Sequence, residues 1–161
     1  MSYELSSHVR EEIDAWKTRF PADQQRSAVI RALHLVQHEN HGWITAEQMN
    51  AVAAYLDLPP IQVYEVATFY SMFQTRECGR NEVSICTNIS CMLRGAEDVV
   101  SHVEQRLGIK LGESTPDGRI YLKREEECIA ACVGAPAMQV NHRDYENLTP
   151  EMADEIREGL E

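Results

Sequence analysis

The chain has 161 residues, 43% of them hydrophobic, which suffices for one ordinary core or for a small domain with a helical extension. Its formal net charge of -11 argues against nucleic acid and anionic membrane surfaces as partners, because both are bound through Lys and Arg. No run approaches the roughly 20 apolar residues of a membrane span, and segment 1–20 carries charges throughout, unlike a secretory signal. We therefore expect a globular chain without direct membrane insertion.

Two amphipathic helices are predicted first. Val9, Ile13 and Trp16 recur at helical spacing before Pro21, which separates this segment from the next. The second helix is predicted to end at the Asn-His-Gly sequence of residues 40–42. Its apolar face consists of Val29, Ile30, Leu33 and Val36.

A third and a fourth helix follow. Thr45 and Gln48 form the capping-box pattern of a helix start. Pro60 suits the first position of the next helix, which is predicted to run to Phe73 and is apolar over much of its circumference. A helix so poor in charge should be buried on more than one side, either in its own bundle or against another protein. The predicted N-terminal domain, residues 1–75, is therefore a helical bundle.

After a polar linker at 74–81, the periodicity becomes that of a mixed fold. Val83 and Ile85 alternate with polar residues, as in a strand with one buried face. A Thr-Pro pair at 149–150 supplies an N-cap and a first-turn proline for a closing helix. This order predicts an open sheet with helices packed on it, and hence an α+β chain. The expected elements are strand 82–87, helix 91–107, strand 119–123, a hairpin of 137–141 with 144–146, and helix 149–160.

Four of the five cysteines form two close pairs, Cys86 with Cys91 and Cys128 with Cys132. In a chain with an odd number of cysteines and no secretory signal, clustered thiols are more often metal ligands than disulfides. Zinc knuckles most often enclose two residues, whereas these pairs enclose four and three, which favours a 2Fe-2S cluster. Arg94 stands where the plant-type ferredoxin motif has its next cysteine, which excludes that motif.

The predicted elements bring both pairs to one end of the sheet. Cys86 leaves a strand and Cys91 opens a helix, while the second pair follows the next strand. A helix N-terminus offers unpaired N–H groups and a favourable dipole to an anionic cluster. We expect the N–H donors to the cluster sulfurs to be those of Thr87, Ser90, Val133 and Gly134.

Other interpretations of the cysteines and histidines remain open. A structural four-cysteine zinc module would be colourless, whereas a 2Fe-2S protein is red-brown. A dithiol oxidoreductase would favour Cys-x-x-Cys, which neither pair has. Cys78 is interpreted as a linker thiol without a ligand role, and His34, His38 and His41 as helix residues rather than a metal site. No Gly-rich dinucleotide fingerprint follows a strand, so nicotinamide and flavin are expected on another protein.

Four tracts of the chain match one known family when taken together. They are His-Gly-Trp-Ile at 41–44, the helix at 62–73, the first cysteine pair, and the tail from the second pair through Val-Gly-Ala to Pro136. Over about residues 5–160 the chain resembles the thioredoxin-like 2Fe-2S subunit of respiratory complex I. The resemblance implies a thioredoxin-like domain at 76–161 after the helical domain. It also implies that one 2Fe-2S cluster is held by Cys86, Cys91, Cys128 and Cys132.

The resemblance implies an activity for the assembled complex. The chain would be an electron-transfer subunit of NADH:quinone oxidoreductase that exchanges single electrons with the FMN of a partner subunit, which also binds NADH. No catalytic acid or base is expected in this chain, because the chemistry belongs to the cofactors. The expected location is cytoplasmic, in the peripheral arm of an inner-membrane complex. Equivalent subunits occur in NAD-reducing hydrogenases and NAD-linked formate dehydrogenases, and that alternative stays open.

Three local expectations concern the loop and the partner. Ala130 stands at a usual glycine of the family, and a positive φ there would cost free energy. X-Pro bonds are trans by default, although a cis bond before Pro136 would support the cluster loop. Part of an aromatic and methionine stripe is expected to dock the flavin subunit. This stripe consists of Phe69, Tyr70, Met72 and Phe73.

Overall fold

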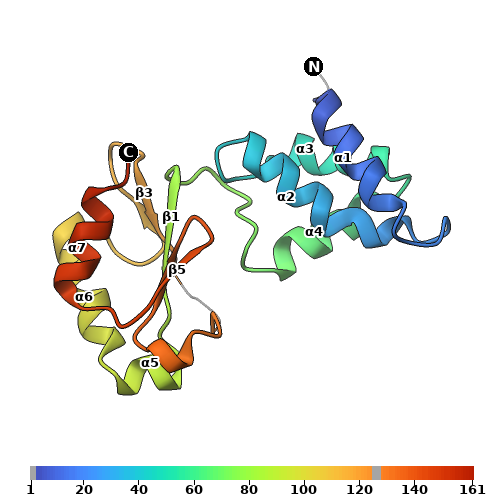
Figure 1. Ribbon diagram of the computed structural model, residues 1–161. Coiled ribbons are helices and arrows are strands. Elements are labelled where there is room, and N and C mark those ends of the chain that lie inside the picture. The colour runs from blue at the N-terminus through green and yellow to red at the C-terminus, as the bar shows by residue number, and fades with distance from the viewer. Residues whose placement is uncertain (1–2, 125–127) are drawn as a thin grey trace. The chain divides into compact units, whose positions relative to one another are not determined.

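The computed structural model describes residues 3–124 and 128–161 of the chain (Figure 1). Two compact units make up the chain, Met1–Glu77 and Cys78–Glu161. The first contains helices and no described strand, whereas the second contains a five-stranded sheet with helices. The predicted α+β class, a helical bundle followed by an open sheet with helices packed on it, is confirmed. Within the described part, no helix is both long and apolar enough to cross a bilayer.

The first unit is a bundle of four α-helices closed around one core. Ser6 caps the first helix by accepting from the N–H of Val9, and Thr45 and Gln48 form the predicted capping box. The core is built from the apolar faces of all four helices. The helices are α1 (Ser7–Lys17), α2 (Val29–Glu39), α3 (Ala46–Tyr55) and α4 (Pro60–Phe69), with a 3-10 turn η1 (Gln25–Ala28) before α2.

Two expectations for this unit are wrong. Ile30 of α2 is 38% exposed and lies outside the core. The fourth helix ends at Phe69 rather than Phe73, because Tyr70 adopts an extended backbone conformation. Val63 and Ala67 are the residues by which α4 enters the core, so its own bundle does not bury it on several sides.

The second unit is a sheet of five strands in the order β2-β3-β1-β4-β5. β1 pairs with β3 in parallel, and the other neighbours are antiparallel. Val83 on the central strand pairs with Leu122 on one side and with Val140 on the other. The strands are β1 (Asn81–Ile85), β2 (Glu113–Ser114), β3 (Ile120–Leu122), β4 (Met138–Val140) and β5 (Arg143–Tyr145). The helices are α5 (Ile89–Leu93), α6 (Ala96–Leu107) and α7 (Pro150–Glu158), with a 3-10 turn η2 (Cys132–Gly134).

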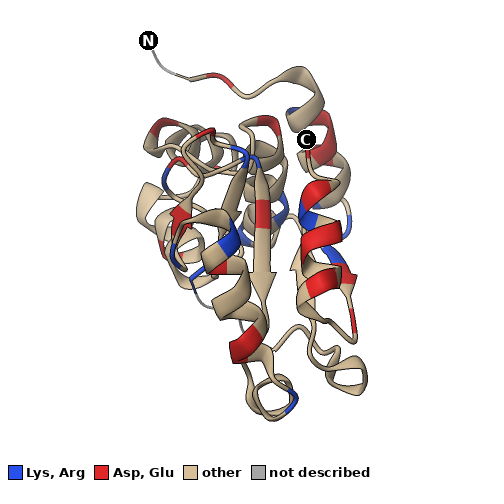
Figure 2. Ribbon diagram, turned by 90° about the vertical axis from the view of Figure 1, so that its left-hand side faces the viewer, with Lys and Arg blue, Asp and Glu red and all other residues tan. Residues whose placement is uncertain are grey.

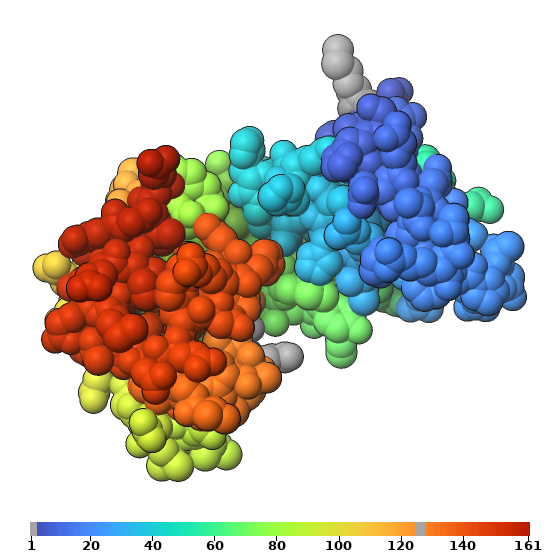
Figure 3. Space-filling model, in the orientation of Figure 1, coloured from blue at the N-terminus to red at the C-terminus, as the bar shows by residue number. Residues whose placement is uncertain are grey.

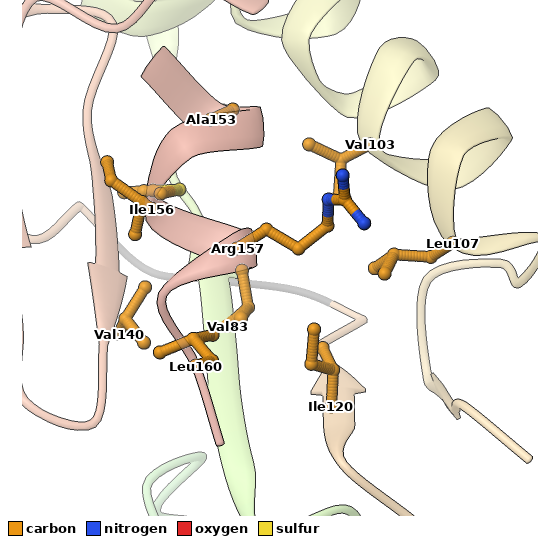
Figure 4. Close-up of a pocket in the computed structure, with 10 residues that line it drawn as sticks. Val83, Val103, Leu107, Ile120, Val140, Ala153, Ile156, Arg157 and Leu160 are labelled. Atoms are coloured by element: carbon orange, nitrogen blue, oxygen red, sulfur yellow. The ribbon is translucent and has the colours of Figure 1, made fainter. Parts of the chain in front are cut away.

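Helices α6 and α7 cover the same face of the sheet (Figure 1). The inward residues of β1 and β3 meet Val99 and Val103 of α6 and Ala153 of α7 in one buried cluster. An apolar pocket lies among these elements, and the aliphatic part of Arg157 extends across it (Figure 4). Burial of this cluster drives the packing of helices onto sheet, at roughly 25 cal/mol for each Å² of apolar surface removed from water.

The surface of the second unit is acidic along α7, where carboxylates recur through the helix (Figure 2). On the face that Figure 3 shows, segments after β3, coloured orange to red, form most of the surface of this unit. Thr149 caps α7 by accepting from the N–H of Met152, and Pro150 occupies the first turn, as predicted.

The predicted boundaries of the second unit need three corrections. The first strand ends at Ile85, so Cys86 follows it rather than closing it. The helix expected at 91–107 is two helices, because Gly95 adopts a left-handed conformation with φ 89° between α5 and α6. Strand β2 was not predicted, since two residues are too few for a period to be recognised.

Candidate metal centre

The parallel pairing of β1 with β3 positions the two cysteine pairs. Parallel strands end at the same edge of a sheet, so the segments that leave β1 and β3 begin side by side. Cys86 comes directly after β1 and Cys91 lies in α5. Cys128 belongs to the segment after β3, and Cys132 begins η2. The fold therefore brings both predicted pairs to one edge of the sheet.

The four sulfurs interact with one another. The Sγ atoms of Cys128 and Cys132 lie 3.4 Å apart. The pKa of Cys91 is raised, chiefly by burial. A hydrogen bond with Cys86 and repulsion from Cys86 and Cys132 raise it further. The pKa of Cys132 is raised as well, chiefly through its contact with Cys128. Neighbouring thiols that resist simultaneous ionisation are expected where several thiolates await a cation.

The two pairs differ in their exposure to solvent. Cys86 and Cys91 are 1% and 2% exposed and form a small buried cluster with Ala96 and other alanines. Cys128 and Cys132 are exposed. A group held between the pairs would therefore have one side inside the fold and one side toward the surface.

Three groups interact with the cysteine sulfurs, and one of them belongs to a predicted residue, Ser90, although through its hydroxyl rather than its N–H. The N–H of Ala130 donates to Cys128 and lowers the pKa of that thiol, and the N–H of Ala137 donates to Cys91. The hydroxyl of Ser90 interacts with the Cys132 sulfur. The N–H of Gly134, predicted as a donor, is bonded instead to the carbonyl of Ala131 at 3.0 Å. Ala130 and Ala137 carry no side-chain signal, so only the backbone path could identify them.

The loop that carries the exposed pair has a constrained backbone. Ala130 has φ 62°, the left-handed conformation for which glycine is favoured. The Ala135-Pro136 bond is cis, so the trans default does not hold here. The N–H of Cys86 donates to the Ala137 carbonyl at 3.0 Å, which ties this loop to the end of β1.

Four thiols in two pairs fit the chemistry of a 2Fe-2S cluster. Across residues 3–124 and 128–161, no three His, Cys, Asp or Glu side chains gather closely enough to share one ion. A structural zinc site needs four donors around one point, whereas a 2Fe-2S cluster is held by four thiolates spread over two irons. The 3.4 Å contact between Cys128 and Cys132 and the contact between Cys86 and Cys91 are compatible with two thiolates on each of two irons.

The remaining candidate residues belong to other parts of the chain. His34 is half-buried and packs its ring against Phe73, with centroids 4.9 Å apart. His38 and His41 are exposed. Cys78 is half-buried at the start of the second unit. Among the residues that the structure describes, these side chains form no metal-binding group.

Comparison with known proteins places the sequence in a family. A model of the thioredoxin-like 2Fe-2S ferredoxin matches residues 13–161. An NADH-quinone oxidoreductase subunit of Rickettsia bellii is 41% identical over 142 residues, which are 88% of this chain and 84% of that protein. An NADH-quinone oxidoreductase subunit of Rhizobium meliloti is 42% identical over 94% of this chain and 88% of its own. The mitochondrial NADH dehydrogenase (ubiquinone) flavoprotein 2 of Dictyostelium discoideum is 43% identical over 81% of this chain and 53% of its own.

Solved structures confirm the fold. The air-oxidized NAD+-reducing NiFe hydrogenase matches 86% of this chain with a TM-score of 0.70 at 22% identity. Its H2-reduced state matches 78% with a TM-score of 0.67 at 23% identity. The chain spans only 24% and 22% of those two chains. At such identities the likeness concerns the fold.

Proposed function

Because the chain belongs to the thioredoxin-like 2Fe-2S ferredoxin family, we propose that it is the electron-transfer subunit of an NADH:quinone oxidoreductase and holds one 2Fe-2S cluster. Cys86, Cys91, Cys128 and Cys132 would supply its four thiolate ligands. The observation that carries this proposal is the meeting of two close cysteine pairs at one edge of the sheet. Relatives named as subunits of NADH-quinone oxidoreductase support the host complex.

The protein holds and insulates the group, while the cofactor supplies the redox chemistry. When bound, a 2Fe-2S cluster accepts and releases one electron. Cys86 and Cys91 fix its inner side in a cluster of buried alanines that excludes water. The N–H groups of Ala130 and Ala137 and the hydroxyl of Ser90 donate to thiolate sulfurs. Such donors stabilise the more negative reduced state and so raise the reduction potential.

The electron partner is a flavin subunit that binds FMN and NADH. No dinucleotide fingerprint occurs in the sequence, so nicotinamide and flavin belong to that partner. Apolar side chains surround the exposed side of the site, including Ile89, Leu93 and Val133, at 72%, 74% and 102% exposure. In the other unit, Phe69 and Tyr70 are 79% and 40% exposed, as a docking surface requires. The complex places this chain in a peripheral arm on the cytoplasmic side.

Iron and sulfide analysis tests the cluster. Anaerobically purified chain should contain about two irons and two acid-labile sulfides per molecule, should be red-brown, and should give an EPR signal on reduction. Stoichiometric zinc in a colourless protein would support a structural module instead and would overturn the proposal.

A second experiment tests the partner. Tyr70→Asp places a charge on the exposed stripe and should abolish co-purification of the flavin subunit while cluster content stays unchanged. Ile30→Asp, at a comparably exposed apolar position on α2, is the matched control and should leave co-purification intact. Unchanged assembly of Tyr70→Asp would exclude this stripe. The identity of the co-purified proteins separates an NADH:quinone oxidoreductase from a hydrogenase or formate dehydrogenase host.

A further inference from the structure

The sulfurs of the exposed cysteine pair, Cys128 and Cys132, lie in contact with each other. The Sγ atoms of Cys128 and Cys132 are 3.4 Å apart, close to van der Waals contact. Between them, Ile129 and Ala131 pack against the buried cluster that contains Cys86 and Cys91. These two side chains anchor the loop, so the neighbouring sulfurs remain paired at the surface. A disulfide bond is about 2.05 Å long, so closure requires the sulfurs to approach by about 1.4 Å.

The two cysteine pairs differ in how accessible their thiols are to solvent. Cys86 and Cys91 are 1% and 2% exposed, whereas both Cys128 and Cys132 are exposed. Oxidants dissolved in water reach exposed thiols first, and a second thiol in contact traps the initial product. The fold thus separates four thiols of one site into two that are accessible and two that are protected.

We propose that, before a cluster is inserted, Cys128 and Cys132 form a reversible disulfide site that closes on mild oxidation while Cys86 and Cys91 stay reduced. The oxidant is a small disulfide such as glutathione disulfide. One sulfur of the pair attacks it and releases one glutathione thiol, leaving a mixed disulfide. The other sulfur then attacks the protein sulfur of that mixed disulfide and releases the second glutathione thiol. The protein loses two protons and two electrons, and both pass to the two glutathione molecules.

Closure would control cluster assembly, a consequence that rests on the proposed function. The disulfide removes two of four ligands, and a 2Fe-2S cluster needs all four thiolates. Reduction by a dithiol returns both ligands. The buried pair keeps its two thiols throughout, so the site is ready to bind iron as soon as the exposed pair is reduced.

Trypsin separates the cysteines for measurement. Cleavage after Lys and Arg places Cys78 in peptide 77–80, Cys86 and Cys91 in 81–94, and Cys128 and Cys132 in 125–143. The full chain is stripped of metal with a chelator under reducing conditions, freed of reductant anaerobically, and exposed to glutathione disulfide. Alkylation with N-ethylmaleimide and mass spectrometry then count the thiols in each peptide. Peptide 125–143 should lose two hydrogens at least about tenfold faster than 81–94.

Unfolded chain provides the matched control. In denaturing guanidinium chloride the preference should disappear, because it depends on burial and not on sequence. Cys78→Ser should not change the rate at 125–143. The proposal is overturned if 81–94 oxidises as fast as 125–143 in the native chain. It is equally overturned if 125–143 accumulates glutathione adducts or cross-links to another peptide instead of an internal bond.

Reconstitution separates this inference from the cluster proposal. Oxidised chain incubated with iron and sulfide should stay colourless until dithiothreitol is added, whereas reduced chain should become red-brown directly. If reduced chain takes up no iron but 125–143 still closes selectively, the cluster proposal fails and the disulfide site stands. If oxidised chain assembles the full cluster without reductant, the control of assembly is refuted.

Discussion

The two cysteine pairs occupy structural settings of opposite kinds. Cys86 and Cys91 belong to the framework of β1 and α5 and are buried, whereas Cys128 and Cys132 lie on an exposed loop between β3 and β4. The buried pair is positioned by the packing of the sheet. The exposed pair lies on a loop that contains a left-handed alanine and is held by a few backbone hydrogen bonds. One side of the site is therefore rigid, and the other can respond to solvent.

This difference implies that the two cysteine pairs have different roles while a cluster is inserted. The framework side exists as soon as the sheet forms, because it depends on the burial of Val83 and Ile85 in the second core. The loop side can open or close without disturbing that core. An iron-sulfur protein needs both properties, since the finished cluster must be held rigidly but its components must first enter.

Ligand replacement should give the largest effect. Serine in place of Cys86 or Cys91 should abolish the cluster, because the buried position leaves no water to act as a substitute ligand. Serine in place of Cys128 or Cys132 should leave a small, spectrally altered fraction, because solvent can supply the missing donor there. Iron, sulfide and visible absorption measure the outcome.

Cys78→Ser is the control for these variants and should keep the full spectrum. If all four ligand variants retained equal cluster, burial would not distinguish the two pairs. If the Cys78→Ser variant lost the cluster, the proposed ligand set itself would be wrong.

The sequence predicted the framework better than the loop. The Thr45 capping box is a local pattern with a direct physical cause and occurs as expected. The strand predicted from the alternation at Val83 and Ile85 is present, but Ser84 on its other face is buried as well, because β1 is the central strand of the sheet. The cysteine spacing identified residues that the fold brings together. The split of the predicted helix at Gly95 was missed, because a single glycine is tolerated in many helices.

The donors to the sulfurs could not be predicted in this way. The Ala130 and Ala137 N–H groups are presented by the path of the backbone beside β1 and the cysteines. Side-chain identity carries no signal for either alanine. Likewise, the exposure of α4 depends on which helices pack against it. Its apolar composition predicted burial on several sides, whereas Ile61 is 63% exposed.

Gly134→Ala should have the second-largest effect, and it should act on the loop that carries Cys128 and Cys132. Gly134 is buried, and a β-carbon there would collide with Glu146, including its Cβ at 2.5 Å, so backbone must move. We expect a loss of about 1–3 kcal/mol in unfolding free energy, typical of overpacking, and reduced cluster retention. Chemical denaturation and iron content measure the two effects.

Relief of the collision provides the control for that variant. Glu146→Gly removes the colliding side chain, so the double variant should recover much of the lost stability. Purely additive losses in the double variant would mean that the collision is not the cause.

Ala130→Gly should strengthen the same loop by a smaller amount. The left-handed φ of 62° destabilises the folded chain by about 1–2 kcal/mol when the residue carries a β-carbon. Glycine relieves this strain, but it also makes the unfolded chain more flexible, which lowers the unfolding free energy by about 0.4–1 kcal/mol. The net gain should be roughly 0.5–1 kcal/mol, measured by denaturation. Ala131→Gly, at φ -91°, has no strain to relieve and should destabilise. A loss at Ala130 as well would contradict the left-handed conformation.

Glu104→Gln should give the smallest effect and should spare both cysteine pairs. Hydrogen bonds from Lys110 and the Leu111 N–H, at 2.7 and 3.1 Å, lower the pKa of Glu104 below its ordinary value of 4.5. A lowered carboxyl pKa stabilises the fold above the unfolded value and loses that contribution as the pH falls through the folded value. The variant should therefore be less stable than the parent chain at pH 7 and should match it at strongly acidic pH. Because these contacts lie on α6 and the turn after it, the visible spectrum should not change. A constant stability difference at every pH would show that the carboxylate charge plays no part.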